Sequence, residues 1–380
     1  MSSMITVPAH RNIDLDQLRR MLTDQSTRAL DVKAGAGRMR AVAGNLVLDG
    51  TEPQLGPEGV TMTSGTYTVN DVATAGLADK LGIPVAYLRR LAAEHPDLFD
   101  DNVNGWLARD PRSFLIRCLR NDTGGGIVRA VLSDRYNRID NLDVLFAALD
   151  GIRRANVRVQ FAGCDLTDRR MYLRVYSPQV QVAAPRLLAR YRSPFDGRAG
   201  SELPIVSAGF LISNSETGAG AFSIAPWVRF EVCRNGMVIR RNALRRTHIG
   251  SRMTGSDGVV TASEETTRRT LDLITSRTTD AVTAFLDADY IAEVLRELDT
   301  AAGTPVTDPN ATLKIVGQRL KYSEEQQRDI LAHFIAGADP TAGGVMHAVT
   351  SVAQTLSDAD AAHGLEATAV QALHLAATTA

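Results

Sequence analysis

The alternation of apolar and polar residues changes its period along this chain. Between residues 113 and 239 most apolar residues alternate with polar ones, as in half-buried β-strands. We expect strands over residues 113–120, 126–133, 157–162, 171–176, 205–213, 219–224 and 228–239. The first two flank Asn-Asp-Thr-Gly-Gly at residues 121–125, a turn-forming sequence, so they should pair as a hairpin.

Apolar residues return to a helical period in two other places. Leu142, Leu145, Phe146 and Leu149 fall on one face and predict a long amphipathic helix over residues 141–154. After Gly258 the pattern stays helical to the end. We expect helices over residues 264–287, 290–301, 345–357 and 365–375, another that starts after Ser323, and a short one around 14–23.

Residues 69–91 have the pattern of a helix, a glycine turn and a second helix. Gly82 can take the left-handed conformation that ends the first helix, and Pro84 suits the first turn of the second. This resembles a helix-turn-helix with Arg89 and Arg90 exposed on its second helix. Similar helix pairs also serve only as packing units, so both readings stay open.

Together these patterns predict an α+β fold. We expect an antiparallel sheet core with a long helix, a small N-terminal helical module and an all-helical C-terminal region. The predicted segments are an N-terminal segment and linker at 1–60, a helix-turn-helix-like module at 61–108, the α+β core at 109–255 and the helical region at 256–380. A doubly wound dinucleotide fold is excluded because strands and helices do not alternate.

The composition is that of a folded protein in a reducing compartment. Apolar residues make up 44% and charged residues 22% of 380 residues, with a net charge of −1, which excludes a disordered chain and a polycation. Apolar runs such as 205–212 are far shorter than the roughly 20 residues of a membrane span. With no signal peptide at the start and three cysteines without a Cys-x-x-Cys pair, we expect a cytoplasmic protein with no membrane partner.

The near-neutral total hides two oppositely charged parts. Residues 256–380 carry 8 Lys and Arg against 18 Asp and Glu, a net of −10, so the first 255 residues carry a net of +9. Arginine supplies 38 of the 42 basic residues, which GC-rich coding alone would explain. The position of the arginines is therefore more informative than their number.

Two segments concentrate arginine, and each has a net charge of +6. One is 169–198, and the other is 225–252. The second contains the nucleic-acid-binding candidates Arg229, Arg234, Arg240, Arg241, Arg245, Arg246, His248 and Arg252. Clustered guanidinium groups neutralise phosphates in nucleic-acid complexes. Alternatively, they form salt bridges to the acidic C-terminal region or lie on solvated strand faces.

A run of polar residues follows the predicted strand at 205–213. It consists of Ser213, Asn214, Ser215, Glu216 and Thr217, after which Gly218 and Gly220 break the regularity. Hydroxyls and exposed amides of this kind can bind a phosphate or a sugar, although a plain polar turn has the same composition.

No motif identifies a metal, a cofactor or a catalytic residue. The seven histidines lack zinc-ligand spacing, and Gly124–Gly126 lack the Lys-Ser/Thr of a phosphate-binding loop. We therefore assign no cofactor, no metal and no catalytic residue, and leave open whether the protein is an enzyme.

Four stretches carry a resemblance to a known family: Leu-Ala-Asp-Lys-Leu-Gly-Ile-Pro at 77–84, Leu-Ser-Asp-Arg-Tyr-Asn-Arg-Ile-Asp-Asn at 132–141, Gly-Phe-Leu-Ile-Ser-Asn-Ser-Glu-Thr-Gly at 209–218 and Arg-Arg-Thr-His-Ile-Gly at 245–250. In these stretches the chain resembles the phage- and plasmid-borne proteins known as the domain of unknown function numbered 932. The resemblance covers roughly residues 65–375 and implies a mobile-element context without an established reaction. The hairpins-plus-helix core also resembles the scheme of phage single-strand annealing proteins, by architecture alone.

These observations favour a nucleic-acid-binding protein of phage or plasmid DNA metabolism, with single-strand annealing as one form of that role. Its expected partners are single-stranded DNA and further copies of itself. One alternative is an enzyme acting on a phosphorylated or nucleic-acid substrate through the 213–217 loop and His248, which requires both to meet in one pocket. The other is a homo-oligomeric structural or interaction protein.

Overall fold

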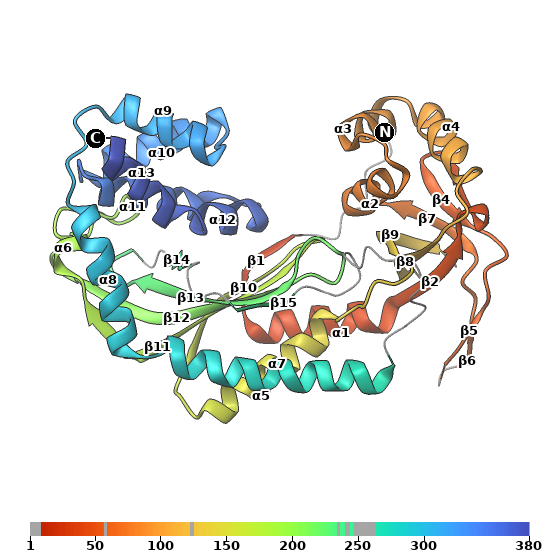
Figure 1. Cartoon of the computed structure of the whole chain (residues 1–380), viewed down its shortest axis with the longest axis horizontal. Helices are drawn as coiled ribbons and strands as arrows, with labels where there is room; N and C mark the ends of the chain where they lie inside the picture. The colour runs from red at the N-terminus through yellow and green to blue at the C-terminus, as the bar shows by residue number, and fades with distance from the viewer. Residues whose placement is uncertain are drawn as a thin grey trace.

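A computed structural model describes residues 9–56, 59–121, 125–233, 236–239, 244–246 and 263–379. It confirms the α+β fold, built on two curled and largely antiparallel sheets with a helical C-terminal region (Figure 1). Within these residues, no helix is both long and apolar enough to cross a membrane.

The larger sheet, sheet A, occupies the middle of the molecule. Its strands run in the order β1-β10-β11-β12-β13-β14, with β15 also paired to β13. Their bounds are β1 His10–Ile13, β10 Gln160–Leu166, β11 Met171–Ala183, β12 Ile205–Asn214, β13 Phe222–Phe230, β14 Gly236–Val238 and β15 Leu244–Arg246. Three helices cover its lower face: α1 Leu15–Arg28, α5 Asn141–Ala155 and α7 Glu264–Phe285 (Figure 1).

Strand β13 joins what the sequence pattern divides into two strands. β15 pairs with residues 222–224 of β13 and β14 with residues 227–229. Pro226 lies between these two pairings, and its carbonyl accepts from the backbone N–H of Ile239 on that outer edge. Because no neighbouring strand needs an N–H at this position, the proline is tolerated inside a continuous strand.

The smaller sheet, sheet B, forms the core of an N-lobe that comprises residues 29–133. Its strands run in the order β2-β8-β9-β7-β4-β3, in which only β7 and β9 pair in parallel. The bounds are β2 Ala29–Gly35, β3 Met39–Val42, β4 Asn45–Leu48, β7 Gly65–Val69, β8 Ser113–Arg120 and β9 Gly125–Ser133. A short helical turn at Ala36–Arg38 precedes β3, and a separate two-stranded ribbon, β5 Gln54–Gly56 and β6 Gly59–Thr61, projects from the lobe.

Helices α2 Asp71–Leu81, α3 Val85–Glu94 and α4 Pro96–Leu107 complete the N-lobe. The predicted helix-turn-helix geometry is present, with Gly82 at φ 68° after α2 and Pro84 directly before α3. Leu77 and Leu88 are buried in the core of sheet B, so this pair of helices is part of the lobe.

The boundaries between the two sheets in the sequence differ from the boundaries of the predicted segments. Residues 29–48, expected as part of an N-terminal segment and linker, form three strands of sheet B. The hairpin of residues 113–133, expected in the central core, also belongs to sheet B. Strand pairing between β2 and β8, which are far apart in the sequence, produces this arrangement, and no local pattern encodes it.

The C-lobe comprises residues 288–379 and is entirely helical. Its helices are α8 Ala288–Ala302, α9 Pro309–Leu320, α10 Glu324–Gly337, α11 Ala342–Thr355, α12 Ala359–Glu366 and α13 Ala369–Thr379. The sequence pattern did not show α9 and α12. The chain between β11 and β12 contains one short helix, α6 Pro185–Leu188. Both lobes rise on the same side of sheet A, opposite α5 and α7 (Figure 1).

Candidate nucleic-acid groove

The positive charge of the first 255 residues belongs to the central part of the chain. Residues 134–255 hold 19 arginines and no lysine against 10 Asp and Glu, whereas residues 29–133 hold 11 basic residues against 12 acidic ones. Sheet A is therefore built from a strongly basic segment, while the N-lobe is close to neutral and the C-terminal region is acidic.

One cavity lies between the N-lobe and the turns at the end of sheet A, and a second, adjoining cavity lies over sheet A. The outer groove has a volume of about 1400 Å³ and is lined by α2, the start of α3, the ends of β8 and β9, Arg169 and residues 217–219. The inner cavity has a volume of about 560 Å³ and lies between the face of β11–β13 and helix α12. Arg169 and Ala219 line both, so the two cavities adjoin at these residues.

Basic side chains predominate in the lining of the outer groove. They outnumber carboxylates five to two, and the charged lining residues are Lys80, Arg89, Arg112, Arg135, Arg169, Asp79 and Asp134. Arg112 is 57% exposed although Asp110 holds it at 2.7 Å. Among the residues that the structure describes, the exposed Arg135 forms no ion pair. An excess of guanidinium groups in a concave surface attracts a polyanion.

Two of these arginines come from different parts of the fold and share one carboxylate. Arg89 of α3 donates to Asp71 at 2.6 and 2.8 Å, and Arg169 of the β10–β11 turn donates to it at 2.9 Å. Burial works to raise the pKa of Asp71, but the hydrogen bonds from Arg89 and Arg169 keep it below the usual value. The trio retains one net positive charge, which makes it a suitable contact for a phosphate.

The polar run at 213–217 is buried at the junction of the N-lobe with sheet A. All five side chains belong to residues that are more than nine-tenths buried: Ser213, Asn214, Ser215, Glu216 and Thr217. Asn214 donates to the carbonyl of Ile139, and the hydroxyl of Ser215 accepts from the backbone N–H of Ala219. Most polar groups of the loop therefore form contacts within the protein. Thr217 and the two residues that follow it line the outer groove.

Glu216 is the centre of this junction. Its carboxylate lies 2.5 Å from Arg129 of β9 and accepts from the backbone N–H of Asn141, the first residue of α5, at 2.8 Å. Burial works to raise the pKa of Glu216, whereas the charges of Arg129 and Arg117 lower it below the usual range. The carboxylate is thus ionised and fully used, which does not fit an acid–base catalyst.

Steric constraints explain why two glycines follow the loop. Gly218 has φ 83°, a conformation that other residues rarely adopt, and its Cα faces the side chain of Leu132. A side chain at Gly220 would overlap the guanidinium of Arg170, which donates to the carbonyl of Ala219 at the mouth of the inner cavity. These glycines let the chain turn sharply between β12 and β13.

Five of the eight candidate residues in the arginine-rich segment at 225–252 fall outside the described residues. They are Arg234, Arg240, Arg241, His248 and Arg252. Arg229 is largely buried, with its guanidinium 4.4 Å from the centre of the Tyr176 ring and 3.9 Å from Glu231, and it does not line the groove. Arg245 and Arg246 lie in β15, whose backbone pairs with Phe222–Ile224 of β13. Ser223 of that stretch lines the inner cavity, so β15 pairs with β13 beside the inner cavity.

The arginines of 169–198 do not converge. Arg169 lines both cavities and Arg170 lines the inner one, whereas Arg174 is buried against Asp165 and Arg198 pairs locally with Asp196. Arg186 approaches the C-lobe carboxylate of Asp299 at 3.7 Å. The outer groove therefore takes its charges from segments at 80, 89, 112, 135 and 169, a set too widely spaced in sequence for local clustering to reveal.

The carboxylate of Asp360 lines the inner cavity and accepts hydrogen bonds from two neutral hydroxyl groups. Tyr172 of β11 donates its hydroxyl to Asp360 of α12 at 2.7 Å, and Thr167 donates to the other oxygen at 2.9 Å. Burial and the charge of Asp360 raise the pKa of Tyr172. The ring of His363 stacks on Tyr172 at 3.8 Å and lies within 2.7 Å of Asp165, which ties α12 to sheet A.

Within the described residues no three His, Cys, Asp or Glu side chains gather closely enough to hold a metal ion. Cys118, Cys164 and Cys233 are each buried. Comparison of the chain with protein-family models, with curated proteins and with solved structures finds no match. The resemblance to the phage and plasmid family thus stays a prediction.

Proposed function

We propose that this protein binds single-stranded nucleic acid along the outer groove. The observation that carries the proposal is the excess of exposed guanidinium groups, Arg112, Arg135 and Arg169 among them, in a depression of about 1400 Å³. Strand β15, one of the described parts of the arginine-rich segment, pairs with β13 beside the inner cavity. The groove continues between sheet A and α12, a bent path that an unpaired strand can follow and a stiff duplex cannot.

From the resemblance to phage and plasmid proteins we propose that this binding serves the DNA metabolism of a mobile element. Annealing of single strands is the specific role that we propose. We place it in the cytoplasm, a compartment that suits a chain with three cysteines and no Cys-x-x-Cys pair. Binding through phosphates requires no base sequence, so affinity should depend strongly on salt.

The test is fluorescence anisotropy with a labelled oligothymidylate between about 50 and about 200 mM salt. Replacing Arg112 and Arg135 together by alanine should weaken binding roughly tenfold or more and reduce the slope of log K against log salt by about 2. The matched control replaces Arg153 and Arg186, which are 80% and 86% exposed and do not line either cavity.

Binding that the control weakens as much as the groove variant would show an unspecific charge effect. Absence of binding even at low salt would refute the function. A clear preference for duplex over single strands would refute the assignment of the polymer.

Self-association is a second candidate role, favoured by one observation. The β5–β6 ribbon pairs with neither large sheet, and Leu55 on it is 84% exposed, with Val60 and Met62 also exposed beside it. An isolated two-stranded ribbon with apolar side chains in water is only marginally stable alone. A mass above 41.0 kDa in light scattering, reduced to the monomer by Leu55→Ser with Val60→Ser, would support assembly through the ribbon.

A further inference from the structure

The inner cavity differs in chemistry from the outer groove. Its walls include the apolar side chains of Leu211, Ala225 and Val238, which belong to a small cluster on the upper face of sheet A. Gly364 of α12 and Ala367, which follows the helix, close it from above. A cavity of about 560 Å³ whose lining combines apolar and polar side chains suits a nucleobase, which has apolar faces and polar edges, better than a phosphate.

Several polar groups of this cavity are held in place by hydrogen bonds to other side chains. The hydroxyls of Ser213 and Ser223 lie 2.9 Å apart on neighbouring strands. Asp360 is held by the hydroxyls of Tyr172 and Thr167, and no cation pairs with it among the described residues. Each carboxylate oxygen thus keeps a free lone pair, so Asp360 is a preorganised acceptor for a ligand that donates.

Arg169 and Arg170 lie where the cavity meets the groove. A strand whose phosphates contact these guanidinium groups would have its bases within reach of the inner cavity. An unpaired base can leave the stack and enter a pocket of this kind, whereas a base in a duplex must first be unpaired.

Resting on the proposed function, we propose that the inner cavity holds one unpaired base of the bound strand and that Asp360 selects guanine. Guanine presents two adjacent donors, the N1–H and N2–H groups, that match the two oxygens of a carboxylate. Thymine and uracil present a single N–H between two carbonyl oxygens, which a carboxylate repels. Asp360 is a specificity residue in this proposal and performs no reaction.

The experiment compares oligothymidylates that carry one central guanine, one central hypoxanthine or no replacement. Hypoxanthine lacks only the amino group of guanine. The guanine strand should bind roughly tenfold more tightly than the plain strand, with hypoxanthine in between. Asp360→Asn should bring the three affinities to within about twofold of one another, and it should raise the affinity for the plain strand because the carboxylate that repels thymine is gone.

Two further variants separate the base site from the fold and from general charge. Ala221→Phe places a ring in the cavity from the far side of Ser223 and should abolish the guanine preference even if Asp360→Asn proves unstable. Asp134→Asn, in the outer groove, should raise the affinity for all three strands equally. Equal binding of the three strands by the unmodified protein overturns the base site alone. Failure of every strand to bind overturns the proposed function and the base site together.

Discussion

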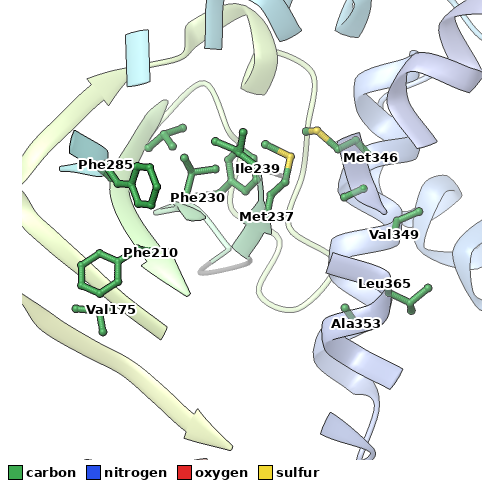
Figure 2. Close-up of a cluster of buried hydrophobic side chains, with 14 of the residues drawn as sticks. Val175, Phe210, Phe230, Met237, Ile239, Phe285, Met346, Val349, Ala353 and Leu365 are labelled. Atoms are coloured by element: carbon green, nitrogen blue, oxygen red, sulfur yellow. The ribbon is translucent and has the colours of Figure 1, made fainter. Parts of the chain in front are cut away.

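The two lobes are joined to the same sheet by opposite kinds of interaction. The C-lobe shares one continuous hydrophobic core with sheet A, α5 and α7, whereas the core of the N-lobe is a separate cluster. Figure 2 shows Phe230, Met237 and Ile239 on the sheet side of the shared core, with Met346 and Val349 of α11 across from them.

The N-lobe is held instead by buried charges. Arg117 of β8 pairs with Asp31 at 2.8 Å and with Asp140 at 2.6 Å, and it donates to the carbonyl of Glu216 at 2.7 Å. Burial works to lower the pKa of Arg117, but the charges of Asp140, Asp31 and Glu216 raise it above its usual value. The difference shows that the chain fixes one wall of the groove by apolar burial and the other by ion pairs, which depend on geometry and on every partner being present.

The largest effect should come from breaking the ionic junction. Glu216→Gln leaves Arg129 and Arg117 buried with less compensating charge, a change that costs about 3–5 kcal/mol. Because the cores are separate, hydrogen exchange should show loss of protection in residues 29–133 with residues 288–379 little affected. Asp134→Asn, which removes a carboxylate from the lining of the outer groove, is the control. Equal loss in both lobes would show that they are not independent.

Acidification should first destabilise the packing of the C-lobe against sheet A. His347 of α11 is fully buried between Tyr191 and Phe230, and burial lowers its pKa to about 4, from 6.5. In the unfolded chain His347 therefore binds a proton below pH 6.5, whereas in the folded chain it does not bind one until the pH falls to about 4. The free energy of unfolding should fall by about 3 kcal/mol across this window.

Urea unfolding followed at pH 7, 5.5 and 4.5 measures this effect. His347→Asn should remove most of the dependence between pH 6.5 and 4. The pKa of Glu216, by contrast, lies below its usual 4.5, so the ionic junction keeps its stabilisation above that pH and loses it only as the pH falls further. N-lobe amides that lose protection before C-lobe amides at pH 5 would contradict the comparison.

A steric change inside the N-lobe should act on that lobe alone. Gly76 of α2 packs against β9, where an added Cβ would lie 2.7 Å from the carbonyl oxygen of Val131. Gly76→Ala should cost about 1–3 kcal/mol through forced separation of helix and strand. Gly105→Ala in α4, whose Cβ would meet nothing closer than 4.0 Å, should leave stability unchanged or slightly raised.

The smallest effect should follow from the exposed member of the ionic junction. Arg138 pairs with Asp31, but its side chain is 53% exposed and Asp31 retains Arg117. Arg138→Ala should therefore cost less than about 1 kcal/mol. A loss comparable to that of Glu216→Gln, measured in the same urea titration, would show that the junction depends on its rim and not on its buried centre.

Local sequence patterns predict most of the helices and strands, but they do not predict which strands pair with each other. The hairpin of β8 and β9, the helix α5 and the pair α2–α3 follow from turn residues, a 3.6-residue period and the Gly82 cap, all of which are short-range signals. The assignment of β2 and β3 to the N-lobe depends on pairing between distant strands, for which no local signal exists.

The sequence by itself determined the α+β class, the acidic helical end and the concentration of arginine in the middle of the chain, because composition and periodicity are properties of neighbours. The tertiary structure decided what the charges do. It buried Glu216 and Arg174 in ion pairs, and it gathered Lys80, Arg112, Arg135 and Arg169 from four distant segments into one groove. A charge acts through the space around it, and only the folded chain determines which groups share that space.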